Sequence, residues 1–219
     1  LNVDFTGKVV VVTGAGGVLC GDMARAYAQA GAKVAALDLN EEAVKKLADE
    51  CKAEGFICEG YKCNVLDPEM IEAVHQQVLK DLGPCDILIN GAGGNKKEAT
   101  VSADRDFFNL DLNAFKWVFD LNVTGAVLTT MVFGELLAKQ GRGNVINIAS
   151  MSSYHPLTNT AAYCGAKAAV ANFTEWMATH FNQNYSDNIR VNAIAPGFLL
   201  TNQNRYLLTN EDGSATPRG

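Results

Sequence analysis

The sequence lacks the cysteine and histidine spacings that mark metal sites and disulfide frameworks. It has six scattered cysteines, none in a C-x-x-C pair and none beside a histidine: Cys20, Cys51, Cys58, Cys63, Cys85 and Cys164. This pattern argues against zinc and against disulfides, and free thiols are typical of a reducing compartment. We therefore expect no metal site and a cytoplasmic location.

The chain also lacks a basic cluster, a signal-peptide pattern and an apolar run of the roughly 18 residues that a membrane span needs. Its 24 acidic and 18 basic residues give a net charge of −6, which disfavours a nucleic-acid partner. We expect neither a nucleic-acid nor a membrane partner. With 219 residues, 48% of them hydrophobic, the chain suits one globular domain over residues 1–219.

Short apolar runs rich in β-branched residues alternate with helical patterns along the chain. We expect strands at residues 8–13, 33–37, 56–64, 86–90, 144–149 and 189–195. We expect helices at residues 18–30, 41–54, 68–82, 114–140 and 160–183. This alternation predicts right-handed crossovers and a parallel sheet covered on both faces, a single doubly wound, Rossmann-type α/β fold.

The first strand runs into a glycine-rich turn that opens the first helix, the place where an open α/β sheet binds a dinucleotide pyrophosphate. The residues concerned are Gly14, Gly16, Gly17, Val18 and Leu19. Asp38 ends the second strand, where a carboxylate accepts both ribose hydroxyls. The same carboxylate repels a 2′-phosphate, so we expect NAD rather than NADP. The alternative for Asp38 is a helix N-cap before Glu41.

Tyr163 and Lys167 stand four residues apart in an alanine-rich segment, and Ser150 precedes them at the end of the fifth strand. Residues at i and i+4 share one face of a helix, so the phenol and the ammonium would point into the same pocket. A free phenol has a pKa near 10, and a fixed cation beside it lowers that value. The pattern predicts a proton-transfer device, although Y-x-x-x-K also occurs by chance in many chains of this length.

Together these features resemble the short-chain dehydrogenase/reductase family from Gly7 to about Thr201. The shared elements are T-G at 13–14, Asp38, N-G-A-G at 90–93, Asn122 in D-L-N-V-T-G, Ser150, Tyr163, Lys167 and P-G-F-L-L-T at 196–201. Segments such as N-G-A-G-G-N and F-K-W-V-F-D-L-N are similar to the branch of D-mannonate oxidoreductases, which interconvert fructuronate and mannonate. The resemblance implies an NAD(P)-dependent enzyme acting on CH–OH groups.

The resemblance also implies roles for four residues. Tyr163 would be the general acid or base, and Lys167 would lower the pKa of Tyr163 and hold the nicotinamide ribose. Ser150 would bond the substrate oxygen, and Asn122 would anchor a water in a proton relay. Taken alone, Ser150 could instead be a turn hydroxyl at a strand end, and Asn122 could satisfy a helix kink.

Further cofactor contacts are implied along the motifs. They involve Asn64, Val65, Asn90, Ala92, Gly93, Pro196, Gly197 and Thr201, besides Tyr163 and Lys167. The family usually has glycines where this chain has Val18 and Cys20, which puts the contacts at the helix start in doubt. Asn64 replaces the usual Asp near the adenine, and an amide can both donate and accept there.

A sugar-acid substrate needs cations and hydroxyl-binding groups near Tyr163. We assign substrate contacts to Asn95, Ser152, His155 and Arg205, with Lys96, Lys97, Asn202, Gln203 and Asn204 on the same loops. Residues from about 197 to 219 would form the substrate loop. The family continues past that loop with a helix and a last strand, which we expect to be absent, leaving an unpaired sheet edge.

Two long helical segments, 114–140 and 160–183, carry apolar residues around most of their circumference, which predicts a homodimer or homotetramer. The predicted function is interconversion of a secondary alcohol and a ketone on a sugar acid or polyol, a small-molecule substrate. Two alternatives remain: a reductase of another carbonyl, such as a 3-oxoacyl thioester, and a non-catalytic dinucleotide-binding sensor.

Overall fold

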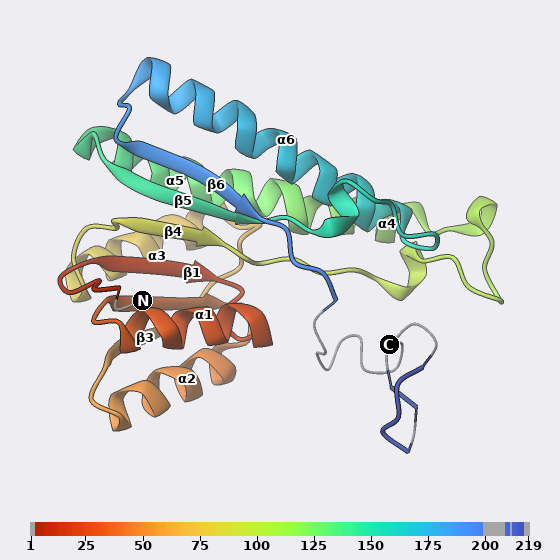
Figure 1. Ribbon diagram of the computed structural model, residues 1–219, viewed down its shortest axis with the longest axis horizontal. Helices are drawn as coiled ribbons and strands as arrows, with labels where there is room; N and C mark the ends of the chain where they lie inside the picture. The colour runs from red at the N-terminus through yellow and green to blue at the C-terminus, as the bar shows by residue number, and fades with distance from the viewer. Residues whose placement is uncertain (1–2, 199–208, 211, 217–219) are drawn as a thin grey trace.

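The computed structural model describes residues 3–198, 209–210 and 212–216, and its centre is a six-stranded parallel sheet (Figure 1). The strand order is β3-β2-β1-β4-β5-β6. The bounds are β1 Val9–Thr13, β2 Lys33–Asp38, β3 Ile57–Lys62, β4 Ile87–Asn90, β5 Gly143–Ile148 and β6 Ile189–Ile194. All six predicted strands are present, and the predicted α/β fold is confirmed.

Alternation of buried residues along β1 explains why helices cover both faces of the sheet. Val10 and Val12 pack in one core with α1 (Val18–Gln29) and α2 (Glu41–Ala53). Val9 and Val11 pack in a second core with α3 (Pro68–Asp81), α5 (Gly125–Gln140) and α6 (Ala161–Asn184). A strand buried on both sides in this way reads as a continuous apolar run, V-V-V-V-T.

Helix starts are set by side-chain caps that satisfy free backbone amides. The Asn40 side chain accepts from the Ala43 N–H at the start of α2. Asp67 does the same for the Glu69 and Met70 N–H groups of α3, with Pro68 in the first turn. Asn40, not Asp38, is therefore the cap before Glu41, which removes that alternative for Asp38.

The long helix expected at residues 114–140 begins at Leu112 and is interrupted by a π-helical turn. The parts are α4 (Leu112–Phe119), η3 (Asp120–Thr124) and α5. The stretch Leu112–Gln140 is long and apolar enough to cross a membrane by length and composition, with 44% of its most apolar window buried in the protein. Phe133 and Leu137 of α5 are fully buried against the sheet, and a core helix meets the same criterion.

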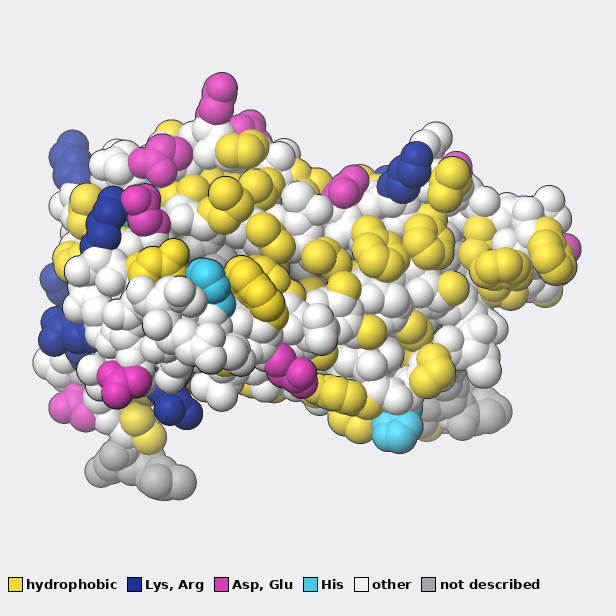
Figure 2. Space-filling view, turned by 90° about the horizontal axis from the view of Figure 1, so that it is seen from above, with side chains coloured by type: hydrophobic (Ala, Val, Ile, Leu, Met, Phe, Trp, Pro, Cys, Tyr) yellow, Lys and Arg dark blue, Asp and Glu magenta, His cyan; other side chains and the backbone are white. Residues whose placement is uncertain are grey.

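The outward sides of α5 and α6 each expose one large apolar side chain. Met131 on α5 is 65% exposed and Trp176 on α6 is 56% exposed. Trp176 stacks on His180 with ring centroids 4.8 Å apart. Figure 2 shows hydrophobic side chains spread across the surface on this side of the molecule.

An excursion between β4 and α4 extends from the carboxyl end of the sheet (Figure 1). It contains two short 3-10 turns, η1 (Lys97–Ala99) and η2 (Phe107–Asn109). A third such turn, η4 (Met151–Ser153), follows β5. These loops all lie at the strand ends where open α/β sheets bind ligands.

Candidate active site

The chain turns in opposite directions after β1 and after β4, which leaves a crevice at the carboxyl ends of these neighbouring strands. β1 leads toward β2 on one side, and β4 leads toward β5 on the other. Two hollows occupy this region, one of about 600 Å³ and one of about 460 Å³. Both are lined by Gly91, Gly93 and Ile148, so they adjoin along these residues.

The larger hollow lies over the glycine turn, whose shape depends on Gly14. Gly14 has a φ of +72°, and a Cβ there would lie 2.8 Å from the Ala92 backbone nitrogen. Thr13 holds the facing loop in place, because its Oγ1 accepts from the N–H groups of Gly91 at 3.0 Å and Ala92 at 3.1 Å. The two loops are thus joined with no room for a side chain between them.

Asp38 faces the glycine turn across this hollow. Its Oδ2 accepts from the Gly16 N–H at 3.0 Å, and its Oδ1 accepts from the Asn40 N–H at 2.8 Å. A Cβ at Gly16 would lie 2.9 Å from the Asp38 Cγ, so only glycine fits opposite the carboxylate. Among the described residues that line this hollow there is no Lys or Arg.

The start of α1 offers backbone donors to the same hollow. Gly17 precedes the helix and caps it with no side-chain hydrogen bond. The first amides of a helix have no partner in the helix itself, and they favour an anion. Val18, in the first turn, is half exposed and lines the hollow. Cys20 is buried there, and burial raises the pKa of its thiol to about 11.

Most of the predicted cofactor contacts come together in the larger hollow. Those that line it are Gly14, Gly16, Gly17, Val18, Leu19, Asp38, Asn64, Val65, Ala92 and Gly93. Pro196 and Gly197 line the smaller hollow. Thr201 lies outside the described residues.

Asn90 is placed differently from the expectation. Its amide is buried and bonds Thr129, Thr130 and Asn147 at 2.6–2.9 Å. It lines neither hollow, so we correct its assignment from a cofactor contact to part of a polar network inside the sheet. That network continues from Asn147 to Thr174 on α6 at 2.8 Å.

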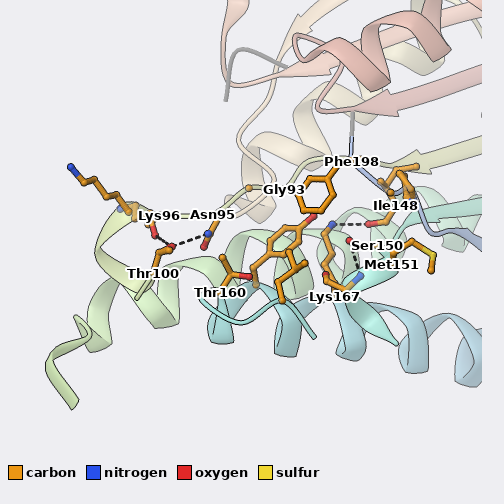
Figure 3. Close-up of a pocket in the computed structure, with 18 residues that line it drawn as sticks. Gly93, Asn95, Lys96, Thr100, Ile148, Ser150, Met151, Thr160, Lys167 and Phe198 are labelled. Atoms are coloured by element: carbon orange, nitrogen blue, oxygen red, sulfur yellow. Dashed lines mark hydrogen bonds between the residues drawn. The ribbon is translucent and has the colours of Figure 1, made fainter. Parts of the chain in front are cut away.

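The smaller hollow brings together Ser150, Tyr163 and Lys167 (Figure 3). Tyr163 and Lys167 lie one turn apart on α6, as the spacing predicted. The Lys167 Nζ donates to the Ile148 carbonyl at 2.7 Å and lies 5.7 Å from the centre of the Tyr163 ring. Lys167 is buried, so its amine is fixed between α6 and the end of β5.

Ser150 is held by the turn that follows β5. Its Oγ accepts from the Ser152 N–H at 3.1 Å, while its own N–H donates to the Ser153 Oγ at 3.3 Å. The Ser153 hydroxyl in turn donates to the Lys167 carbonyl at 2.8 Å. Ser150 is therefore a turn hydroxyl, as the alternative had it, and this turn also directs its hydroxyl toward Tyr163, to which it hydrogen-bonds.

The electrostatics of the site differ in one respect from the expectation. Burial raises the pKa of Tyr163, and the Ser150 hydroxyl opposes this by lowering it. Burial also lowers the pKa of Lys167 to about 8. The protein's own groups thus do not lower the phenol pKa as the resemblance implied, because desolvation of the ring outweighs them.

Asn122 sits in the π-helical turn η3 and ties it to the loop after β4. Its Nδ2 donates to the carbonyls of Gly94 at 2.7 Å and Val118 at 2.8 Å, and its Oδ1 accepts from the Gly94 N–H at 3.3 Å. The bond to Val118 satisfies a carbonyl of the interrupted helix, which is the alternative role stated above. A Cβ at Gly93 would lie 2.6 Å from Asn122 Oδ1 and 3.3 Å from Lys167 Nζ, so only a glycine fits between them.

The predicted substrate residues are only partly brought together. Asn95, Lys96, Lys97 and Ser152 line the smaller hollow. The Lys96 Nζ lies 4.3 Å from the centre of the Trp117 ring, a cation–π contact, and its side chain points away from Ser150 and Lys167 (Figure 3). His155 is exposed and does not line either hollow, so we correct that assignment. Arg205, Asn202, Gln203 and Asn204 lie outside the described residues.

Some positions that line the smaller hollow carried no usable sequence signal. They are Thr100, Leu157 and Thr160, which come from loops and a helix start with no motif, whereas Phe198, which also lines it, belongs to P-G-F-L-L-T. Thr13 differs from these residues, because a single polar residue at the end of an all-valine strand can be recognised in the sequence. Within the described ranges, no group of three or more His, Cys, Asp or Glu side chains is placed to hold a metal ion.

Comparison with known proteins places the chain among dehydrogenases. The family model described as short chain dehydrogenase matches residues 8–212. An uncharacterized oxidoreductase of Haemophilus influenzae is 46% identical over 99% of this chain and 79% of its own length. The uncharacterized oxidoreductase UxuB of Bacillus subtilis is 42% identical over 100% of this chain and 80% of its own length.

A solved structure extends the likeness to three dimensions. It is a crystal structure of a candidate D-mannonate oxidoreductase from Haemophilus influenzae with bound NAD. Its TM-score is 0.90 at 46% identity, covering 99% of this chain and 80% of that chain. The similarity in backbone structure therefore extends over nearly the whole of this chain.

Proposed function

Since the chain belongs to the short chain dehydrogenase family, we propose that it is an NAD(H)-dependent oxidoreductase that interconverts a secondary alcohol and a ketone on a sugar acid or polyol. One observation carries the proposal. The hollow that contains Ser150, Tyr163 and Lys167 shares lining residues with the hollow that contains Asp38, so a dinucleotide site and a proton-transfer site adjoin.

The larger hollow fits NAD(H). The cradle at Gly14 and Gly16 has no space for a side chain, and the uncapped start of α1 presents amides suited to a pyrophosphate. We assign acceptance of the ribose hydroxyls to Asp38, and among the described residues that line this hollow no cation offsets its repulsion of a 2′-phosphate. When bound, NAD(H) supplies or accepts the hydride. The NAD found in the Haemophilus structure supports this choice over NADP.

The proton steps fall to the residues of the smaller hollow. Tyr163 gives a proton to the carbonyl oxygen in reduction and takes it from the alcohol in oxidation. The Ser150 hydroxyl, beside the Tyr163 phenol, bonds the same oxygen as negative charge develops there. Lys167, with a pKa of about 8, exchanges its proton readily near neutral pH and can pass it toward Tyr163, with Asn122 beside it in a relay.

The substrate class follows from the lining of the smaller hollow and from the relatives. Several hydroxyl and amide groups line it, together with Lys97, which suits a hydroxylated and anionic ligand. We propose fructuronate and mannonate as the pair interconverted, on the similarity to the Haemophilus protein. A cytoplasmic location agrees with six cysteines that form no disulfide.

The test is NADH oxidation with fructuronate, alongside a panel of keto sugars and a 3-oxoacyl thioester. Replacing the phenol in Tyr163→Phe removes the proton donor and is expected to lower kcat by about 10²- to 10⁴-fold. NADH affinity, measured by fluorescence titration, should stay within about threefold of wild type. Turnover of the thioester in preference to every sugar would reject the substrate class, and NADH binding with no turnover at all would favour a sensor.

A homo-oligomer is the second part of the proposal. Met131 on α5 and Trp176 on α6 are large apolar side chains that are each more than half exposed. Exposed apolar surface of this kind can mark a contact with another chain. We propose that a second copy of the chain covers these side chains, in a dimer or tetramer.

A further inference from the structure

We propose that Cys20 is a positioning residue for the dinucleotide, because its side chain packs against Gly91 and holds the wall that the two hollows share. The inference rests on the dinucleotide site of the proposed function and adds a residue that shapes this site. Gly91 lines both hollows, and Cys20 lines the larger of them. It also explains how the chain carries a side chain at a position where the family usually has a glycine.

The sulfur of Cys20 occupies the space into which a side chain at residue 91 would project. Cys20 lies in the first turn of α1 and is only 4% exposed. A Cβ at Gly91 would lie 2.1 Å from the Cys20 Sγ but 3.5 Å from the Cys20 Cβ. Non-bonded heavy atoms attract most at about 3.5–4.0 Å and repel when they overlap. On the side of α1 the conflict therefore comes from the sulfur atom alone.

Gly91 is enclosed by three segments that are distant in the sequence. Its N–H donates to the Thr13 Oγ1 at 3.0 Å, and a Cβ on it would lie 2.8 Å from the Thr13 carbonyl oxygen. A Cβ at Gly14 would lie 2.8 Å from the Gly91 carbonyl oxygen, so these two backbones touch. Cys20 closes the remaining side. Because protein interiors are close-packed, the place of Gly91 depends on the size of each neighbour.

Cys20 acts through its size and not through a charge. Burial raises the pKa of its thiol to about 11, while the Lys167 charge lowers it and the Asp38 charge raises it. The thiol is therefore protonated at neutral pH. Lys167 lines the smaller hollow and Asp38 lines the larger one. The sulfur is thus within reach of the charges of both sites that the dinucleotide has to connect.

The packing of Cys20 reaches the catalytic groups through the loop after β4. Gly93 follows Gly91 by two residues and also lines both hollows. A Cβ at Gly93 would lie 2.6 Å from the Asn122 Oδ1 and 3.3 Å from the Lys167 Nζ, so this part of the loop has little space to move. A displaced Gly91 would therefore change the passage between the hollows and the place of the loop beside Lys167.

The experiment is a double-mutant cycle of Cys20→Ala and Gly91→Ala in the whole protein. The dissociation constant for NADH is measured by fluorescence titration, and the free energy of unfolding of the cofactor-free protein is measured with urea. Cys85→Ala is the matched control, because Cys85 is also buried but lines neither hollow. The titration uses no substrate, so its result is independent of the carbonyl compound that the enzyme reduces.

We expect Gly91→Ala to raise the dissociation constant for NADH by about 10- to 100-fold, because the new methyl group displaces the loop or turns the sulfur into the hollow. Cys20→Ala alone should raise this constant by about threefold, because it leaves a gap beside Gly91. Cys85→Ala should lower the free energy of unfolding and leave NADH affinity within about twofold of wild type.

The double variant gives the decisive comparison. Its two methyl groups would lie 3.5 Å apart, an ordinary contact, so adding Cys20→Ala to Gly91→Ala should lower the dissociation constant by about fivefold or more. The contact with the Thr13 carbonyl oxygen remains, so the double variant should still bind NADH more weakly than wild type. The same substitution at Cys20 thus weakens binding in one background and strengthens it in the other.

Three results would overturn the inference. They are an equal effect of Cys20→Ala in both backgrounds, a wild-type NADH affinity of Gly91→Ala, and losses of stability with unchanged affinity in every variant. If Gly91→Ala does not fold, the double variant decides: recovery of folding and NADH binding supports the inference, and failure to fold overturns it.

The titration also separates this inference from the proposed function. A wild-type protein that binds NADH, with the same affinity in all variants, would overturn the inference and leave the proposed function standing. A wild-type protein that binds no NADH would reject the cofactor of the proposed function and the inference with it.

Discussion

Lys167 is the residue whose charge the fold disfavours most clearly. Burial lowers its pKa from 10.5 to about 8, so between these values the unfolded chain holds a proton that the folded chain has lost. Unfolding free energy therefore rises with pH across this window, by up to about 1.4 kcal/mol per pH unit. Below about pH 8 both states are protonated and the full cost of burying the charge remains.

Lys167→Met removes this titration. The free energy of unfolding is measured with urea for both cofactor-free proteins. From pH 8 to pH 10.5, that of wild type should rise relative to that of the variant by on the order of 1–3 kcal/mol. Other thiols and phenols titrate in the same range, but they are common to both proteins and cancel in the difference. Parallel pH profiles for the two proteins would contradict the assignment of a lowered pKa.

At the residue scale, sequence patterns located the reactive groups but not their surroundings. The i, i+4 spacing placed Tyr163 and Lys167 on one helix face because helical periodicity is local. The direction of the phenol pKa could not be predicted, since it depends on how completely distant segments bury the ring. The assignment of His155 as a substrate contact was not supported for a similar reason. Only the path of the loop after Ser150 decides which side chains line the hollow.

At the scale of elements, α6 is docked by a buried polar network as well as by apolar contacts. Asn147 on β5 donates to the Thr174 Oγ1 at 2.8 Å, and Thr174 donates to the Val170 carbonyl at 2.7 Å. Thr174→Val keeps the shape but leaves the Asn147 amide without its acceptor. We expect it to lower the unfolding free energy by about 1–3 kcal/mol.

Thr174→Ser is the matched control, because it keeps the hydroxyl and loses only a methyl group. Its free energy of unfolding, measured with urea, should be intermediate between those of wild type and Thr174→Val. A loss for Thr174→Ser with none for Thr174→Val would mean that packing of the methyl group, and not the hydrogen bond, holds this part of α6.

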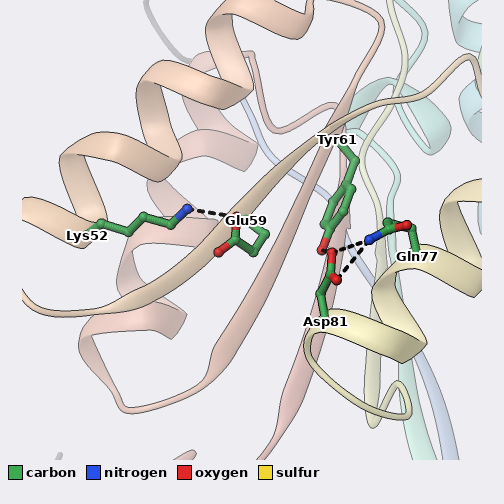
Figure 4. Close-up of polar contacts among 5 residues, drawn as sticks. All are labelled: Lys52, Glu59, Tyr61, Gln77 and Asp81. Atoms are coloured by element: carbon green, nitrogen blue, oxygen red, sulfur yellow. Dashed lines mark hydrogen bonds and ion pairs between the residues drawn. The ribbon is translucent and has the colours of Figure 1, made fainter.

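The edge strand β3 shows how side chains protect an exposed strand. Glu59 bonds Lys52 of α2 at 2.7 Å, and the Tyr61 hydroxyl donates to Asp81 of α3 at 3.0 Å (Figure 4). Gln77 donates to the same Asp81 carboxylate at 2.8 Å. Charged and bonded groups of this kind discourage pairing with another chain. The residues of β3 could be predicted as a strand from their composition. Their side-chain partners could not, because these depend on how the helices before and after β3 pack beside it.

The π-helical turn at Asp120–Thr124 was not predicted, because D-L-N-V-T carries no signal that distinguishes it from an α-helix. Its cause is visible only in the folded chain. Asn122 bonds both the Val118 carbonyl and the loop at Gly94, and a side chain that competes for backbone groups in this way interrupts a regular helix.

At the scale of the whole molecule, the exposed apolar side chains Met131 and Trp176 predict association. Trp176→Glu replaces one of them by a charge and should shift the sedimenting species to the monomer at micromolar concentration. Phe108→Glu is the matched control, since Phe108 is an aromatic residue 89% exposed in the excursion before α4. A wild-type protein that already sediments as a monomer would contradict the proposal.

The architecture as a whole was accessible from the sequence because six β-branched runs alternate with helical segments and right-handed crossovers leave few topologies. The family match over residues 8–212 confirms the resemblance drawn from the motifs. What could not be predicted are contacts between distant segments, such as Asn90 joining the network inside the sheet or Thr100 orienting Asn95.

The strand order also determines when, during synthesis, β1 can pair with each of its two neighbouring strands. Val10 on β1 pairs with Ile87 on β4, so the strand with the most continuous valine run receives its second neighbour only after three crossover segments have been made. At a synthesis rate of about 5–20 residues per second, that interval lasts on the order of 4–15 seconds. During that time one edge of β1 is open to other chains, which makes the yield of folded protein sensitive to chain concentration and to chaperones.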